Sequence, residues 1–176
     1  KPYSAPQSES NDNGSKNDYL PNPKIARLWN QWKSHTAVLG LTASQAKFAE
    51  TFFRGYSCGI TGEAGVGKSY LTKAIFDFLT ANKVNVGKCG TTGVASFNIG
   101  GQTINSWAGL GLADEPVENI INKLAKNRKV QDRLRAVEVL FIDEASMAKG
   151  DLLNKLNGVM KHYRYSYAPF GGVQLV

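Results

Sequence analysis

A glycine-rich run in this sequence ends in a lysine and a serine, at a spacing that suits phosphate chemistry. Glycines let the backbone curl until successive N–H groups face one anion. A lysine there can reach the β- and γ-phosphates of ATP, and a serine hydroxyl can bind Mg²⁺. The run matches G-x-x-x-x-G-K-[ST] and reads Gly62, Glu63, Ala64, Gly65, Val66, Gly67, Lys68 and Ser69. We expect these residues and the next one, Tyr70, to bind ATP, with Lys68 catalytic and Ser69 a metal ligand.

Two acidic residues, Asp143 and Glu144, follow a continuous apolar run over 139–142 that suits a buried strand. Ligands of α/β proteins lie at the carboxyl ends of the strands. We therefore expect Asp143 to hold Mg²⁺ and Glu144 to orient the attacking water or accept its proton. The pair could instead cap a following helix, an interpretation that stays open here.

Gln45 lies upstream of the glycine run and has two interpretations. The segment Thr42, Ala43, Ser44 and Gln45 fits a capping box, in which the glutamine side chain bonds the Thr42 amide. The same amide could instead pair with the edge of an adenine.

The elements that must position these residues follow an α/β order. Apolar periodicity predicts helices over 43–54, 68–80, 117–126, 129–136 and 152–163, and strands over 56–61, 84–90, 139–142 and 172–176. The first strand, helix and strand form a right-handed βαβ unit with parallel strands. The sequence therefore predicts an α/β domain with a parallel sheet flanked by helices.

The first forty residues differ from the rest in composition. Residues 1–23 are rich in Ser, Asn, Asp and Pro and predict a flexible polar arm. Residues 24–40 predict an accessory helix whose apolar stripe packs on the core rather than on a partner. That stripe consists of Ile25, Leu28, Trp29 and Trp32.

The overall composition sets further limits. The 176 residues are 42% hydrophobic and carry a formal charge of +7, which favours a polyanionic partner. Cys58 and Cys89 are far apart, without metal-ligand spacing, and are expected to be reduced thiols in the core. No apolar run approaches the ~20 residues of a membrane span, and no signal region precedes the domain, so we expect a soluble intracellular or viral protein.

A basic stretch between 120 and 135 contains one acidic residue, Asp132. It would attract phosphates, although it could equally be the solvated face of a helix. Its basic members are Lys123, Lys126, Arg128, Lys129, Arg133 and Arg135, of which Arg128 and Lys129 are candidates for DNA binding.

Four segments together resemble the PIF-type DNA helicases of superfamily 1B, and the resemblance covers residues 41–176. The longest, GTTGVASFNIGGQTINSWAG over 90–109, is similar to motif Ia and the segment that follows it in that family. The others are KNRK over 126–129, DEASM over 143–147 and PFGGVQLV over 169–176.

The resemblance implies a RecA-like P-loop NTPase domain, numbered 1A in that family. Its members move 5′ to 3′ on single-stranded DNA and unwind duplexes, G-quadruplexes or RNA–DNA hybrids with ATP. It also implies that Gln45 recognises adenine and that two short segments line the DNA path. These are Thr91, Thr92 and Gly93, and then Asn105, Ser106 and Trp107.

Two positions depart from the family pattern, which usually has His at Asn105 and Phe at Trp107. Asparagine can still hydrogen-bond a phosphate or base, and tryptophan offers a larger face for stacking. Considered alone, however, Trp107 is more typical of a core residue.

The resemblance also bears on the extent of the domain. We expect it to be truncated before motif III, with the second RecA-like domain and its charge-neutralising arginines absent. The chain alone would then be a weak or inactive ATP hydrolase. We expect a monomer that acts at DNA junctions in repair, replication or telomere maintenance, in a nucleus, mitochondrion or viral factory. The alternatives are a nucleotide-dependent single-stranded DNA adaptor without turnover and, less well supported, a nucleotide kinase.

Overall fold

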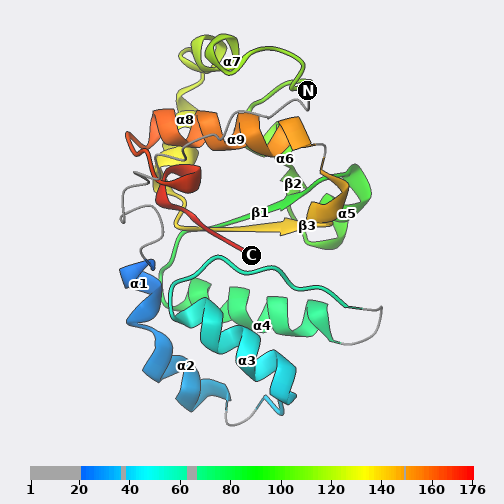
Figure 1. The fold of residues 1–176 in the computed structure, drawn as a ribbon, viewed down its shortest axis with the longest axis vertical. Coiled ribbons are helices and arrows are strands. Elements are labelled where there is room, and N and C mark those ends of the chain that lie inside the picture. Colours follow the sequence, from blue (N-terminus) through cyan, green and yellow to red (C-terminus); the bar gives the residue numbers. More distant parts are fainter. Residues whose placement is uncertain (1–20, 37–38, 63–66, 149) are drawn as a thin grey trace, which may run out of the picture.

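The computed structural model describes residues 21–36, 39–62, 67–148 and 150–176 (Figure 1). Most of the expected arm, 1–20, lies outside the described residues. So do Glu63, Ala64, Gly65 and Val66 of the glycine run. No helix in the described ranges has the length and apolar character that crossing a membrane requires.

A parallel sheet of four strands, in the order β2-β1-β3-β4, forms the centre of the described structure. The strands are β1 (Val86–Gly90), β2 (Gln102–Thr103), β3 (Val139–Asp143) and β4 (Gln174–Leu175). Gly90 pairs with Asp143, so β1 and β3 end together at one edge of the sheet. The predicted parallel α/β fold is therefore confirmed.

The strand predicted over 56–61 is wrong. These residues are not classified as a strand, and their one backbone bond to the sheet runs from Cys58 N to Leu175 O, at 3.0 Å. Leu175 N donates instead to the Ser57 hydroxyl, at 2.9 Å. The expected βαβ unit therefore lacks its first strand in this structure.

The strand predicted over 172–176 is shorter than expected. Gly172 belongs to the 3-10 turn η2 (Pro169–Gly172), in which Phe170 and Gly171 have positive φ angles of 51° and 63°. β4 begins only after this turn, at Gln174.

Four helices cover one face of the sheet, the lower one in Figure 1. They are α1 (Pro23–Ala26), α2 (Trp29–Thr36), α3 (Ala43–Phe53) and α4 (Lys68–Ala81). Ile25 and Trp32 are almost fully buried, and the Trp32 ring stacks on Phe53 with centroids 4.7 Å apart. The expected packing of the 24–40 stripe on the core is confirmed for these two residues.

The accessory region starts earlier than its composition suggested. Asn22, expected in the arm, caps α1 and donates its backbone N–H to Gly55 O at 2.9 Å. Gly55 has a φ of +93°, and a Cβ there would lie 2.6 Å from the Asn22 nitrogen. The close backbone approach requires glycine at the end of α3.

A second helical layer covers the other face. It contains α6 (Ile104–Ala108), α7 (Val117–Leu124), α8 (Arg128–Ala136) and α9 (Gly150–Tyr163). Alternation along β3 divides the core, because Val139 and Phe141 face the lower helices while Leu140 faces this layer. Cys89 is buried here as a free thiol, as expected, and Cys58 is a half-buried free thiol on the other side.

Two smaller elements lie at the carboxyl edge of the sheet, on the right in Figure 1. They are α5 (Gly93–Asn98), which follows β1, and the 3-10 turn η1 (Ala145–Met147), which follows β3. Both follow segments that the sequence assigned to function.

Candidate nucleotide and nucleic-acid site

The beginning of α4 is shaped for an anion. Gly67 precedes the helix with a φ of +80°, and a Cβ there would lie 2.6 Å from the Gln45 Nε2 atom. The left-handed φ favours glycine, whereas the Gln45 amide is the end of a flexible side chain that could move aside. The first turn of α4 presents backbone N–H groups and the positive end of the helix dipole, which together favour a phosphate.

The predicted catalytic lysine lies across this turn. The Lys68 ammonium donates to Gly62 O at 2.5 Å, which places it over the first glycine of the run. Ser69 and Tyr70 are exposed, and the Tyr70 hydroxyl donates to Leu39 O at 3.2 Å. A phosphate oxygen in this position would replace the carbonyl as the partner of the lysine.

Of the two interpretations of Gln45, the structure confirms the capping box. The capping box is present, because Gln45 Oε1 accepts from Thr42 N at 2.9 Å and Thr42 Oγ1 accepts from Gln45 N at 3.3 Å. Its Nε2 also donates to Gly67 O at 3.4 Å. Gln45 therefore lies against the phosphate loop, while adenine recognition stays a prediction.

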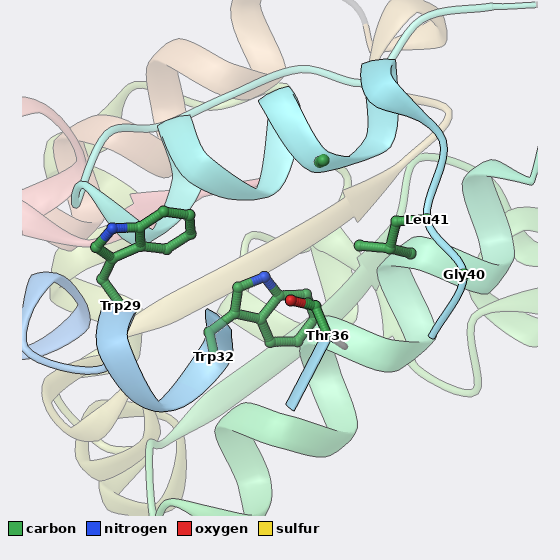
Figure 2. A pocket seen from close by; sticks show the side chains of 6 residues that line it. Trp29, Trp32, Thr36, Gly40 and Leu41 are labelled. Atoms are coloured by element: carbon green, nitrogen blue, oxygen red, sulfur yellow. The ribbon is translucent and has the colours of Figure 1, made fainter. Parts of the chain in front are cut away.

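A hollow of about 300 Å³ lies beside the first turn of α3, on the side of α2. In Figure 2 the Trp29 ring points toward α3, and the Trp32 ring lies beside Thr36 on the side of Leu41. None of the side chains in its lining is charged, so the hollow cannot neutralise a phosphate.

The two acids lie where β3 ends. The Asp143 carboxylate is half-buried and accepts from Glu144 N at 3.1 Å through Oδ1. Glu144 is exposed and has a φ of +54°, which costs a non-glycine residue about 1–2 kcal/mol. Its side chain makes no cap hydrogen bond to η1, so a plain capping role is not supported.

Thr91 holds this strained turn in place. Its backbone N–H donates to Asp143 O at 3.2 Å, and its hydroxyl donates to Glu144 O at 3.0 Å. Thr91 follows β1, so the first residue of the expected DNA path is hydrogen-bonded to the backbone carbonyls of Asp143 and Glu144. Backbone strain maintained by its surroundings is typical of functional sites.

The loop and the acids share one edge of the domain. In Figure 1 the tip of β3 and the beginning of α4 lie at the same end. Helix α4 packs under β3, and the rings of Phe76 and Phe141 have centroids 6.1 Å apart. The structure thus brings Lys68 and Ser69 to the edge that carries Asp143 and Glu144.

These residues fit Mg²⁺ as it is bound beside nucleotides. The described residues contain no cluster of three or more His, Cys, Asp or Glu that would hold a metal alone. Mg²⁺ in such sites uses one or two carboxylates, water and the substrate phosphates. The Asp143 carboxylate and the Ser69 hydroxyl are donors of this kind.

The Thr91–Gly93 segment leads into α5. Thr92 caps this helix, because its hydroxyl accepts from Ala95 N at 3.1 Å. The outer side of α5 is apolar, since Val94 is 73% exposed and Phe97 is 85% exposed. Neither residue was predicted as a site residue, although both lie in the run that carries the family resemblance.

The Asn105–Trp107 segment forms α6, and here one expectation is corrected. Trp107 is 5% exposed and belongs to the core under α8, so its ring has no free face for a base. The core interpretation of Trp107 is the right one. Ser106 is exposed, and the half-buried Asn105 donates through Nδ2 to Gly111 O at 2.8 Å.

Arg133, from the basic stretch, turns inward. Its guanidinium lies 5.5 Å from the Trp107 ring centroid and donates to Gln102 Oε1 at 3.3 Å and to Ser106 O at 3.4 Å. Burial lowers the pKa of this guanidinium. Arg133 therefore packs against the buried side of α6 and stabilises it. Arg128 and Lys129, in contrast, are exposed at the start of α8.

The fold and the site together define a RecA-like P-loop NTPase domain. The family model of the PIF1-like helicases matches residues 40–176, and the chain belongs to this family. It is similar to the ATP-dependent DNA helicase PIF1 of Candida albicans, at 44% identity over 137 residues, which are 77% of this chain and 15% of that protein.

Solved structures agree with this assignment. The crystal structure of Pif1 helicase from Candida albicans matches with a TM-score of 0.72 and 44% identity, over 77% of this chain and 31% of that one. Pif1 helicase from Bacteroides in complex with ADP-AlF3 and ssDNA matches with a TM-score of 0.58 and 27% identity, over 77% and 31%. This chain thus spans less than a third of the relatives it matches.

Proposed function

We propose that this chain is the ATP-binding motor domain of a 5′-to-3′ DNA helicase that moves along single-stranded DNA. One observation carries the proposal. Thr91, at the start of the expected DNA path, is hydrogen-bonded to the carbonyls of Asp143 and Glu144, across the sheet edge from Lys68. A change in the phosphates can therefore pass to the DNA surface through a single residue.

The nucleotide roles follow from the positions of the side chains. Lys68 leaves the Gly62 carbonyl for the β- and γ-phosphates, and Ser69 with Asp143 holds Mg²⁺. Glu144 projects from a strained turn at the exposed edge and orients the attacking water. Gln45, fixed by its capping box, meets the adenine beside the loop.

The DNA path runs over α5 and the start of α6. Thr92, Gly93, Asn105 and Ser106 offer hydroxyl, backbone and amide groups to phosphates. Phe97 takes the stacking role that was expected of Trp107, because the Phe97 ring is exposed. Arg128 and Lys129 add positive charge outside this path.

The finer assignments are also part of this proposal. The substrates are single-strand to double-strand junctions or G-quadruplexes, and the protein acts as a monomer in DNA repair, replication or telomere maintenance. It works inside a nucleus, a mitochondrion or a viral factory.

A second RecA-like domain would supply the arginines that stabilise the transition state. Arginine fingers are worth roughly 10³–10⁵ in rate, so we expect little turnover from this chain alone. The test compares DNA-stimulated ATP hydrolysis in this chain and in a longer version with the second domain, each beside its Lys68→Ala variant. The helicase proposal is supported if DNA stimulates ATP hydrolysis by the longer version and Lys68→Ala abolishes that stimulation.

The same experiment distinguishes the adaptor. An adaptor would bind single-stranded DNA in an ATP-dependent way while neither version hydrolyses ATP, and that result would contradict the helicase proposal.

A further inference from the structure

A second surface lies where α9 ends, on the side of the sheet opposite the nucleotide edge (left in Figure 1). A hollow of about 460 Å³ opens there, within the size range of small-molecule sites. Its lining consists of Gly158, Lys161, His162, Tyr165, Ser166 and Tyr167. None of these residues belongs to the nucleotide site or to the α5 surface.

At the end of α9 a tyrosine occupies a strained backbone conformation. Tyr165 N donates to His162 O at 3.2 Å and Ser166 N to Lys161 O at 3.1 Å, which together make a Schellman motif. Tyr165 occupies its left-handed position, with a φ of +51°, where glycine is usual. The cost of this conformation is not recovered by packing, because Tyr165 is 83% exposed.

A second exposed ring and a cation accompany Tyr165. Tyr167 is 94% exposed and belongs to no helix or strand. Lys161 has no ion-pair or hydrogen-bond partner for its ammonium among the described residues. His162 is exposed, and its ring contacts Tyr163 edge to face at 4.9 Å.

The surroundings of the hollow favour an anion. The sequence has no Asp or Glu from 152 to 176, and Lys161 and Arg164 lie in this stretch, whereas the buried Lys155 is already paired with Asp151. Arg164 points inward and donates to four backbone carbonyls, among them Val137 O at 2.7 Å and Gly171 O at 2.8 Å. It thereby fixes the turn that presents Tyr165, while its charge adds to the field.

We propose that the end of α9 is a second binding surface for single-stranded nucleic acid. Tyr165 and Tyr167 stack on bases, and Lys161 neutralises a phosphate between them. Exposed aromatic rings next to a cation suit a strand that carries both bases and phosphates. The surface requires neither ATP turnover nor the α5 path, so it can hold a strand that has left the motor or is about to enter it.

Photo-crosslinking locates the contact directly. The 176-residue chain is irradiated with oligothymidylate that contains 5-iodouracil, and the crosslinked tryptic peptides are identified by mass spectrometry. The proposal requires a crosslink in the peptide 165–176, which trypsin releases after Arg164. Crosslinks confined to 91–109 would overturn it and leave the helicase proposal intact, whereas no crosslink at all would count against both.

Substitutions then separate function from packing. Tyr165→Gly relieves the left-handed strain, so it should raise the melting temperature while it weakens oligonucleotide binding by roughly 5- to 100-fold. Anisotropy is measured in a Phe97→Ala background, so that the α5 surface does not mask the loss. The matched control is Tyr56→Ser, which removes another exposed tyrosine ring and should leave affinity unchanged.

Two further results would contradict the proposal. One is an unchanged affinity in Tyr165→Gly and in Tyr167→Ser. The other is displacement of the oligonucleotide by poly-glutamate at equal charge, since that would show that the surface binds any polyanion, or an acidic protein, without using bases.

Discussion

Two short helices in the segment 90–109 begin alike and end in opposite environments. Thr92 caps α5 through Ala95 N, and Thr103 caps α6 through Ser106 N at 3.2 Å. Each helix carries one aromatic side chain. Phe97 of α5 is 85% exposed, whereas Trp107 of α6 is 5% exposed.

The difference arises from where each helix meets the sheet. α5 stands at the end of β1, where its backbone lies so close that a Cβ on Gly90 would be 2.2 Å from Ser96 N. Its outer side therefore faces solvent. α6 lies on the face of the sheet, under α8, where Leu140 and Arg133 enclose the Trp107 ring. An aromatic residue next to a DNA motif can thus serve either binding or stability, depending on the position of its helix.

The largest effect should come from truncating the buried ring. Trp107→Ala leaves a cavity in the core and should lower the free energy of unfolding by about 3–5 kcal/mol, measured by urea denaturation. Phe97→Ala, the matched change on α5, should stay within about 0.5 kcal/mol of the parent. Equal losses in the two variants would invalidate the comparison.

Binding should show the reverse order. Phe97→Ala should weaken the binding of single-stranded DNA by about 1–3 kcal/mol, because one stacked base is lost, as measured by fluorescence anisotropy. Leu112→Ala removes another side chain that is 87% exposed and serves as the control. If both variants bind like the parent, α5 does not lie on the DNA path.

The core that contains Trp107 also contains Cys89, and this thiol predicts that stability depends on pH. Burial raises the pKa of the Cys89 thiol to about 12 from its ordinary value of 9.0, against a smaller opposing effect of the Arg133 charge. Above pH 9 the unfolded thiol loses its proton while the folded one keeps it. The unfolded state then binds fewer protons, so stability falls as pH rises, by at most about 1.4 kcal/mol per pH unit.

Cys89→Ala isolates this contribution. Unfolding is measured at about pH 8 and about pH 10.5, on either side of the pKa of the unfolded thiol. The loss of stability between the two values should be smaller in the variant. Other groups that titrate in this range, Cys58 included, are common to both proteins, so parallel pH profiles would mean that Cys89 is not protected by the core.

The smallest effects should be those of the two caps. Thr92→Ala and Thr103→Ala each remove one hydroxyl that accepts a helix N–H, and each should cost about 1 kcal/mol. Thr→Ser at the same positions keeps the acceptor and serves as the control. Similar losses would confirm that α5 and α6 differ in packing alone and not in how they start.

Much of the fold followed from local patterns. The periodicity of 68–80 predicted α4 within one residue of its observed end at Ala81, and the apolar run before Asp143 predicted β3. The Thr42–Gln45 capping box is present as expected. The glycine run and the acids were found from residue types and spacing, because nucleotide chemistry restricts both.

Other features were missed because they depend on distant partners. The segment 56–61 has the composition of a strand, yet its neighbour β4 offers it a single backbone bond. α5 and α6 are too short for periodicity to distinguish. The basic stretch suggested one surface, but Arg133 turned away from solvent toward Trp107, a residue 26 positions earlier in the numbering.

The sequence by itself determined which groups can meet a triphosphate and in what order the helices and parallel strands occur, since spacing and capping act within a few residues. Tertiary structure alone decided that Phe97 is free and Trp107 buried, that Glu144 is held in a strained turn by Thr91, and that Tyr165 takes a place suited to glycine. Those outcomes depend on contacts between segments far apart in the chain, and the free energy of such contacts is set by packing, which no local pattern records.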